Sequence, residues 1–168
     1  MSDVVSIELL LDSETEALVR IDWDRLAAAG LSSLASHRAS SNRPHVTLLV
    51  RPTLDRVDFA DAVALLPVVI TLSGPILFRH GDRAVLARRV VPTKELLRLH
   101  RAVHQAVPPG EDAAHTVPGR WTPHVTLARR VRMDVVADAL RLLGPERVGV
   151  GLALRRWDSA AAQVTPII

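Results

Sequence analysis

The chain has 168 residues, 48% of them hydrophobic, and it carries a formal net charge of +3 and no cysteine. This length is sufficient for one domain with a sizeable core. The lack of cysteine excludes a disulfide framework, a thiolate nucleophile and cysteine-ligated zinc. Arginine supplies 20 of the 21 basic residues, which suits phosphate ligands, but a GC-rich coding bias explains this ratio equally well. The net charge is too small to establish a nucleic-acid partner.

The start of the chain has neither the pattern of a signal peptide nor that of a membrane span. Residues 1–3 are acidic, and the apolar run at residues 4–11 is only long enough for a strand. We therefore expect a cytoplasmic protein that does not enter a membrane. A monomer is the default expectation.

The first half of the sequence predicts strands that alternate with helices. Residues 4–11 are typical of a buried strand, and residues 13–16 have the spacing of a capping box that begins a helix, which Gly30 would end. The segments that follow are a polar loop or edge strand at 31–42, a strand at 43–50, a helix at 55–66 ended by Pro67, and an antiparallel hairpin of strands at 68–72 and 84–91.

The second half contains one long segment without periodicity. Thr93 is placed to cap a helix that runs to about Val107. Residues 108–122 then show no pattern, and a loop of this length is typically either a substrate lid or disordered. The remaining segments are a strand at 124–130, a helix at 132–143, a break at Gly144 and Pro145, and strands at 147–157 and 163–167.

The pentapeptide Pro-His-Val-Thr-Leu occurs twice, at residues 44–48 and 123–127, so its two histidines lie 79 positions apart. Each copy is followed by a short connection, a helix, a proline-containing break and two strands. With small gaps, Phe78 also aligns near Trp157. The pattern indicates an internal duplication with one long repeat rather than a solenoid, whose repeats are shorter and more numerous.

A duplication places equivalent residues symmetrically about a pseudo-twofold axis. We therefore expect an α+β fold in which residues 1–168 form a single two-lobed domain built from two βαββ units. Because these units do not alternate strictly between strand and helix, the sheets of both lobes should be antiparallel. The two motif strands should line a central cleft, with the helices packed outside.

Each copy of the motif presents an imidazole and a hydroxyl on the same face of its strand. Side chains alternate along a strand, so His45 lies beside Thr47 and His124 beside Thr126. Core packing would explain one such histidine, but it gives no reason to keep both groups in two repeats. Two imidazoles and two hydroxyls around one point suit in-line displacement at phosphorus, with one imidazole as base, the other as acid, and the hydroxyls on the non-bridging oxygens. This scheme needs no metal or other cofactor.

The paired segments His45-Val46-Thr47-Leu48 and His124-Val125-Thr126-Leu127 resemble the signature of the two-histidine (2H) phosphoesterases, in particular their 2′-5′ RNA ligase-like (LigT-like) branch. The resemblance covers nearly the whole chain through the duplication. It implies a bilobal fold around a water-filled cleft, and metal-independent hydrolysis of 2′,3′-cyclic phosphates, on RNA ends or small cyclic nucleotides, to 2′-phosphates. Some members also join or cleave 2′-5′ linkages in RNA.

The same resemblance implies different roles for the two histidines. His45 would be the acid that faces the leaving 3′ oxygen, and His124 would be the base that activates water. The pseudo-symmetry of the fold also permits a substrate to bind in the opposite sense, which would exchange the two roles.

Three residues near the second motif are further candidates for substrate contacts. Members of the family often carry a basic residue at the position of Arg130, and strand alternation puts it on the face of His124 and Thr126, so we expect it to bind phosphate. Arg129 is the second choice because it should point away, and a solvated strand-end arginine is the alternative. Trp121 could stack on a base, although packing between the lobes explains it equally well.

The other histidines give weaker signals. His100 and His104 have a metal-ligand spacing on a predicted helix, but no third ligand is evident and an amphipathic helix explains both. His37 and His115 lie close enough to the motifs in sequence to reach the cleft, whereas His80 sits in a turn. We therefore assign no metal site.

The sequence leaves more than one class of function open. The leading hypothesis is an enzyme, a cyclic phosphodiesterase whose histidines transfer protons. The alternative is a non-catalytic module that binds a phosphate-bearing nucleotide or RNA end, because both histidines could serve only as donors to phosphate. A metal-dependent hydrolase built on His100 and His104 is a third, weaker hypothesis.

Overall fold

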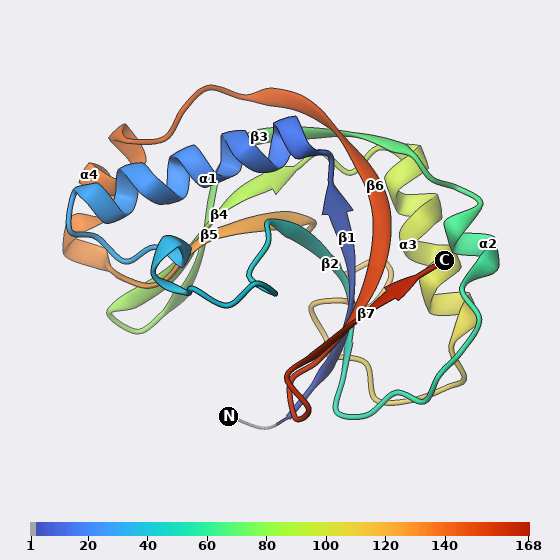
Figure 1. Ribbon diagram of the computed structural model, residues 1–168. Helices are drawn as coiled ribbons and strands as arrows, with labels where there is room; N and C mark the ends of the chain where they lie inside the picture. The colour runs from blue at the N-terminus through green and yellow to red at the C-terminus, as the bar shows by residue number, and fades with distance from the viewer. Residues whose placement is uncertain (1–2) are drawn as a thin grey trace.

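The computed structural model describes residues 3–168 and contains, within that range, one seven-stranded antiparallel sheet (Figure 1). The strands are β1 (Val5–Leu11), β2 (His45–Arg51), β3 (Val68–His80), β4 (Arg83–Val90), β5 (His124–Arg132), β6 (Arg147–Asp158) and β7 (Gln163–Ile167). The helices are α1 (Ser13–Ala28), α2 (Ala60–Val63), α3 (Lys94–Ala106) and α4 (Val136–Arg141), with 3₁₀ turns at Leu34–Ser36 and Met133–Val135. None of the helices in the described range is long and apolar enough to cross a membrane.

The sheet closes on itself through β6. The strand order is β1-β2-β5-β4-β3-β6-β7, and β6 also pairs with β1. The first part of β6 pairs with β3 and its second part with β1 and β7, so this strand passes from one lobe to the other. The lobes are joined at two places, β2 with β5 and β3 with β6. The expected antiparallel α+β architecture is confirmed, with the strands of both lobes hydrogen-bonded into one sheet.

The strand pairings show how the two halves correspond. The series β1-α1-β2-α2-β3 matches β4-α3-β5-α4-β6 in order and in pairing, and β7 is added at the edge. The symmetric unit therefore starts one strand earlier than the motif does. Ser6 pairs with Trp157 as Val85 pairs with Phe78, which confirms the alignment of Phe78 with Trp157.

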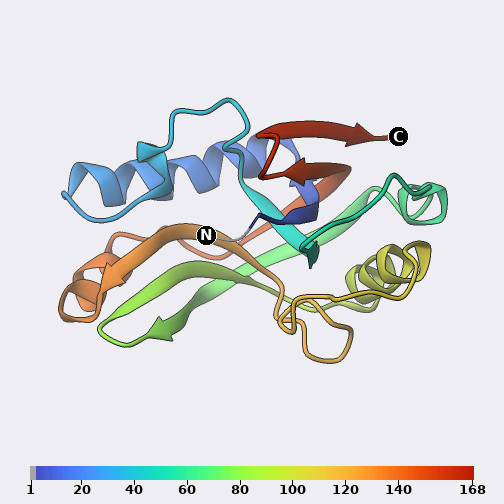
Figure 2. The same cartoon turned by 90° about the horizontal axis from the view of Figure 1, so that it is seen from below.

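Each long helix packs against strands of the other half. Helix α1, which follows β1, contacts β5 and β6, whereas α3, which follows β4, contacts β2 and β3. Figure 1 shows α1 with α4 on one side of the molecule and α3 with α2 on the other. In the view from below these two groups of helices lie at opposite ends of the sheet (Figure 2). This exchange of helices holds the two lobes together.

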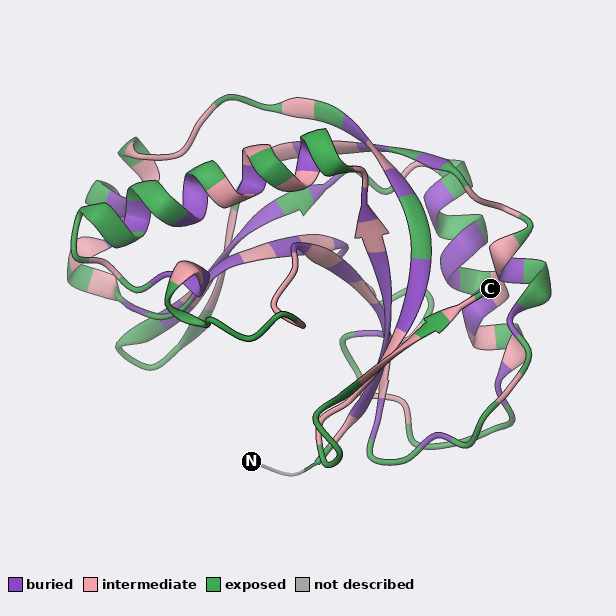
Figure 3. Cartoon of the chain, viewed as in Figure 1, coloured by how far each residue is buried: buried purple, intermediate pink, exposed green. Residues whose placement is uncertain are grey.

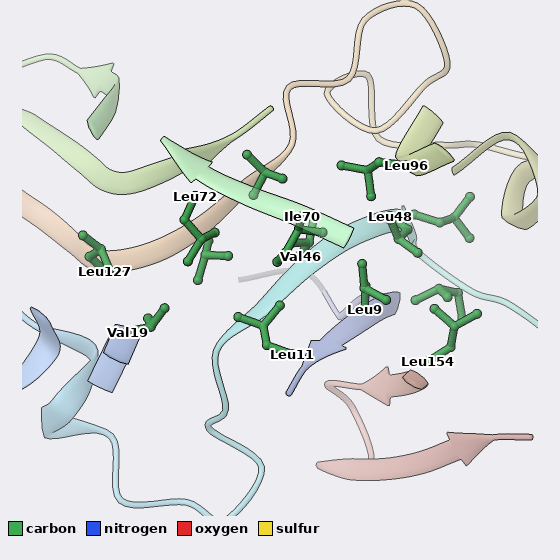
Figure 4. Packing of buried hydrophobic residues seen from close by; sticks show 14 of the residues in the cluster. Leu9, Leu11, Val19, Val46, Leu48, Ile70, Leu72, Leu96, Leu127 and Leu154 are labelled. Carbon is green, nitrogen blue, oxygen red and sulfur yellow. The ribbon is translucent and has the colours of Figure 1, made fainter. Parts of the chain in front are cut away.

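The core lies between the sheet and the helices. Buried positions follow the strands and the helix faces turned toward them (Figure 3). Leu9 and Val46, from neighbouring strands, are fully buried in one cluster (Figure 4). Helix α3 turns Leu96, Leu99 and Val103 toward this core, and all three are buried. Burial of each such side chain stabilises the fold by about 1.5–3 kcal/mol.

The two long helices begin at capping residues. Thr93 caps α3 as predicted, and its Oγ1 accepts a hydrogen bond from the backbone N–H of Leu96 at 3.3 Å. Helix α1 is capped one residue earlier than expected, by Asp12 instead of Ser13. The carboxylate of Asp12 accepts from the backbone N–H of Thr15 at 2.9 Å, which satisfies one free donor of the first turn.

The other two predicted helices are wrong in extent. Helix α2 is a single turn, because residues 52–59 form no regular element and bury Leu54 and Phe59 in the core. Helix α4 begins later than expected, because β5 continues to Arg132 and a 3₁₀ turn follows it. In both segments the apolar residues have helical spacing, but they pack an irregular connection against the core and do not form one face of a long helix.

Candidate active site

Each motif strand carries a β-bulge directly after its threonine. In β2, Leu48 is an extra residue between the pairs made by Thr47 and Leu49 with β1. In β5, Leu127 is the extra residue at the equivalent place opposite β4. An extra residue reverses which face the following side chains occupy. The motif residues before each bulge and selected residues after it therefore face the same cleft.

The two motifs meet where the lobes join. The single antiparallel contact between β2 and β5 is made by the valines of the two motifs, and it sets each histidine opposite the threonine of the other motif. Directly opposite side chains on one face have Cβ atoms about 4.5–5.5 Å apart, and diagonal ones about 7–8 Å. A single cavity of about 740 Å³ is lined by His45, Thr47, His124 and Thr126.

The two imidazoles have the same orientation. His45 Nδ1 lies 2.7 Å from the carbonyl oxygen of Arg43, and His124 Nδ1 lies 2.8 Å from that of Thr122. A carbonyl oxygen only accepts hydrogen bonds, so Nδ1 carries a proton in both rings. The Nε2 atoms are then the positions that can give or take a proton in a reaction.

The rest of the cavity is cationic and partly apolar. Arg79, His80 and Arg129 contribute to its lining, and the lining residues within 3–168 include no carboxylate. Arg43 also lines the cavity, but its charge is paired with Glu16 at 2.7 Å. Arg79 and Arg129 form no ion pair within residues 3–168, and their charges create a positive potential that favours an anionic ligand.

His124 lies in apolar surroundings. Phe78 from β3 packs against it, with the ring centroids 4.7 Å apart. Burial lowers the pKa of His124 below its ordinary value of 6.5, and the charges of His115 and His45 act in the same direction, against the opposing hydrogen bond to Thr122. A lowered pKa keeps this imidazole neutral near neutral pH, which is the state that a general base requires.

A buried ion pair lies beside His45. Glu8 from β1 accepts hydrogen bonds from Arg155 Nε at 2.7 Å and from Ser6 Oγ at 2.7 Å. Its Oε1 is 3.5 Å from His45 Nε2, which is an ion-pair distance. Glu8 and Arg155 are each 4% exposed, so water screens this carboxylate only weakly. Glu8 therefore sets a buried carboxylate, itself paired with Arg155, beside the proton-exchanging nitrogen of His45.

Arg129, and not Arg130, lines the cavity. The prediction that Arg130 shares the face of the motif residues is wrong, because the bulge at Leu127 reverses the side-chain alternation after it. Arg130 has a positive φ of 59° and borders a neighbouring hollow. Val50 occupies the matching cavity position on β2, so only the second motif strand contributes an arginine.

Two tryptophans bind the bulged strands. Trp121 Nε1 donates a hydrogen bond to the carbonyl oxygen of Thr47 at 2.9 Å, and Trp23 Nε1 donates to that of Thr126 at 3.1 Å. A bulge disrupts the sheet ladder, so these indoles satisfy acceptors at the disrupted positions. Trp121 also stacks on His100 with ring centroids 3.9 Å apart. Because Trp121 lines the cavity as well, base stacking stays a prediction for this residue.

The loop at residues 108–122 is held against β2 by polar contacts and forms one wall of the cavity. His104 Nε2 lies 3.1 Å from the carbonyl oxygen of Leu48, and its Nδ1 lies 3.1 Å from Asp112. Asp112 also accepts a hydrogen bond from Arg51 Nε at 2.5 Å. These contacts hold the loop in place without a metal ligand set.

His100 packs beside this network. Its Nε2 donates to the carbonyl oxygen of Thr116 at 2.8 Å, and burial lowers its pKa to about 4, with the charge of His104 acting in the same direction. Among residues 3–168 no group of three or more histidine, cysteine or acidic side chains is arranged to hold a metal ion. His115 reaches the cavity as expected, and His37 reaches only the neighbouring hollow.

The sequence does not single out several residues that shape this site. Glu8, Arg155 and Trp23 lie far from the motifs in sequence. The turn residues around His80 indicate a hairpin, which explains this histidine without a role in the site. The one available signal was Glu8, a charged residue inside an otherwise apolar strand, because a buried carboxylate requires a partner. The partner, Arg155, is 147 residues away and no local pattern indicates it.

The fold and the site together define a duplicated α+β protein with paired imidazoles and hydroxyls in a cationic cleft. The family model of the 2′-5′ RNA ligase superfamily matches residues 15–166. The chain therefore belongs to the 2′-5′ RNA ligase superfamily, whose members are two-histidine phosphoesterases, and the resemblance of the paired motifs is confirmed.

A solved structure shows the same fold. The structure of Usb1 from Kluyveromyces marxianus aligns with a TM-score of 0.53 at 13% sequence identity, covering 99% of this chain and 98% of that chain. A second structure of that Usb1, with uridine monophosphate, aligns over the same shares at 13% identity with a TM-score of 0.49. A search of curated proteins gave no match.

Proposed function

We propose that the protein is a metal-independent phosphodiesterase that hydrolyses 2′,3′-cyclic phosphates, on RNA ends or on nucleotides, to 2′-phosphates. The observation that carries this proposal is the arrangement of two imidazoles with matched orientation, each opposite the other motif's hydroxyl, in one cavity. The cationic lining of the cavity suits a phosphate, and the family supports phosphoester chemistry. Cytoplasmic location and a monomeric state belong to the same proposal.

In the proposed reaction His124 is the base and His45 is the acid. His124 Nε2 takes a proton from water as the water oxygen attacks phosphorus. The bond between phosphorus and the 3′ oxygen breaks, and His45 delivers its Nε2 proton to that oxygen. Each transfer contributes on the order of 10²–10⁴-fold in rate. The lowered pKa of His124 and the carboxylate of Glu8 beside His45 support this division of roles.

The hydroxyls and one arginine complete the proposed site. Thr47 and Thr126 donate hydrogen bonds to the non-bridging phosphate oxygens, each contributing about 1.5–3 kcal/mol because the acceptor is charged. Arg129 takes the phosphate-binding role first expected of Arg130, since of these two arginines only Arg129 lines the cavity. A 5′ hydroxyl of a second RNA in place of water would give a 2′-5′ linkage with the same groups, so ligation is a possible second activity of the site.

Turnover of uridine 2′,3′-cyclic phosphate by purified, EDTA-treated protein tests the proposal. We expect the 2′-monophosphate as product, identified by ³¹P NMR, with a bell-shaped dependence of kcat/KM on pH. The 3′-monophosphate as sole product would reverse the roles of the two histidines. Tight binding of the 2′-monophosphate by a protein that turns over no cyclic phosphate would contradict the enzyme and support the phosphate-binding module.

A further inference from the structure

A second hollow opens beside the cavity, and we call it the side hollow. It lies between the segment at residues 32–37, the β3–β4 hairpin and the end of β5. Leu34, His80, Val85 and Arg129 line both the cavity and the side hollow. A ligand that extends from the two histidines past Arg129 therefore enters the side hollow directly.

The side hollow carries three arginines. Arg83, Arg129 and Arg130 line it, and within residues 3–168 none of them forms an ion pair and none of the lining residues is a carboxylate. The next arginine along β5, Arg132, differs because Asp134 binds it. These three exposed guanidinium groups, which lack a counter-charge from the described residues, create a positive potential that favours an anionic ligand.

The backbone holds these arginines in place. Arg129 and Arg130 lie at a second register shift of β5 against β4, where Arg130 has a positive φ of 59°, and both arginines border the side hollow. Ser32 Oγ donates a hydrogen bond to the carbonyl oxygen of Arg129, which links the segment at residues 32–37 to β5. Serine hydroxyls and the imidazole of His37 add further donors to the same lining.

We propose that the side hollow binds the phosphodiester next to the reacting phosphate, so that the preferred substrate is an RNA end of two or more nucleotides rather than a cyclic mononucleotide. This inference rests on the proposed function. One anion in the cavity is sufficient to occupy the two motifs and Arg129, and Arg83 and Arg130 remain to bind a second. A chain of nucleotides carries that second phosphate at every linkage, and a cyclic mononucleotide carries none.

The test compares two substrates and two matched variants. The substrates are uridine 2′,3′-cyclic phosphate and a trinucleotide that ends in a 2′,3′-cyclic phosphate. The double variant Arg83→Gln/Arg130→Gln removes two charges of the side hollow, and Arg98→Gln/Arg101→Gln removes two exposed charges from α3, far from it. The measured quantity is the ratio of kcat/KM for the trinucleotide to kcat/KM for the mononucleotide.

We expect wild-type protein to prefer the trinucleotide, and the side-hollow variant to reduce that ratio about tenfold or more. Its trinucleotide activity should also depend less steeply on salt, because fewer phosphate contacts release fewer counterions. The α3 variant should keep the wild-type ratio. An unchanged ratio in the side-hollow variant would overturn the inference while leaving the phosphodiesterase intact.

Failure of the proposed function gives a different result. If wild-type protein turned over neither substrate, binding of a fluorescent trinucleotide with a 2′-phosphate end would be measured by anisotropy in the same three proteins. Weaker binding by the side-hollow variant alone would support the second phosphate site. Equal binding by all three would overturn it.

Discussion

The two walls of the cleft share a geometry and differ in chemistry. His45 and His124 occupy equivalent positions, each with Nδ1 on a backbone carbonyl and each before a bulge. Beside His45 lies the buried pair of Glu8 and Arg155. The equivalent positions in the other lobe hold Ala87 and Ile76, with Phe78 against His124.

This difference shows how a duplicated site can acquire two roles. The backbone fixes position and tautomer, and both halves keep them. The neighbouring side chains differ: a buried carboxylate lies beside His45, and apolar cover favours the neutral ring at His124. A symmetric fold can therefore hold an acid and a base at one phosphorus atom.

Replacing either histidine should have the largest effect. His45→Ala and His124→Ala should each lower kcat by about 10²–10⁴-fold, because each removes one proton transfer, and the double variant should lose less than the product of the two. Steady-state turnover of the cyclic phosphate measures this, with thermal unfolding as the check on folding. A near-wild-type rate in either variant would contradict paired roles for the two walls.

Removing the hydroxyls should have a smaller and nearly equal effect on both walls. Thr47→Val and Thr126→Val keep the shape of the side chain and should each reduce kcat/KM about tenfold to a hundredfold, the loss of one charge-assisted hydrogen bond. Thr→Ser at the same positions is the matched control and should stay close to wild type. Valine and serine variants of equal activity would show that the hydroxyls do not contact the reacting phosphate.

Removing the carboxylate beside His45 should distinguish the walls. Glu8→Gln should lower kcat about tenfold, because it removes the carboxylate that lies 3.5 Å from the Nε2 atom that delivers the proton. Loss of Glu8 leaves Arg155 buried and unpaired, so Glu8→Gln/Arg155→Met keeps the measurement possible if the single variant unfolds.

The control for Glu8 is another buried ion pair. Asp22→Asn breaks the pair with Arg88, which is joined at 2.9 Å and lies outside the cavity lining. This variant should lose stability and keep the wild-type kcat at a temperature where it is folded. A Glu8→Gln variant that also kept the wild-type kcat would show that Glu8 is a folding residue with no role in proton transfer.

Reducing the apolar cover of His124 should have the smallest effect. The base works only when neutral, so kcat/KM falls as the pH drops through its pKa, and the lowered pKa places that limb below pH 6.5. Phe78→Leu should move the limb a few tenths of a pH unit upward, toward 6.5, with only a few-fold change in rate.

Phe59→Leu offers a matched control for this change. Phe59 is buried in the core away from the cavity lining, so losing its ring should affect stability alone. A wild-type acid limb at or above pH 6.5 would contradict the assignment of His124 as the base.

The sequence predicts those structural features that depend on the spacing of nearby residues. The alternation of side chains gives the shared face of His45 and Thr47, and Thr93 marks the start of α3 correctly. The repeat itself gives the two-lobed architecture, since equivalent segments must fold alike. These features depend on residues a few positions apart, or on the comparison of one half with the other.

The structural features that the sequence does not predict depend on packing between residues far apart in the chain. The bulge at Leu127 depends on the strand opposite, and it exchanges the faces of Arg129 and Arg130. Glu8 can be identified as a site residue only from its contacts with a partner on β6 and a histidine on β2. Such contacts leave no periodic pattern, so the asymmetry between the walls emerges only from the structure.

The most direct test of the central claim is a crystal structure of the protein with a nucleoside–vanadate adduct, which mimics five-coordinate phosphorus. We expect Nε2 of His124 and Nε2 of His45 within hydrogen-bonding distance of the two apical oxygens, with both motif threonines on equatorial oxygens. An adduct bound outside the cleft, or one that contacts a single imidazole, would contradict the account.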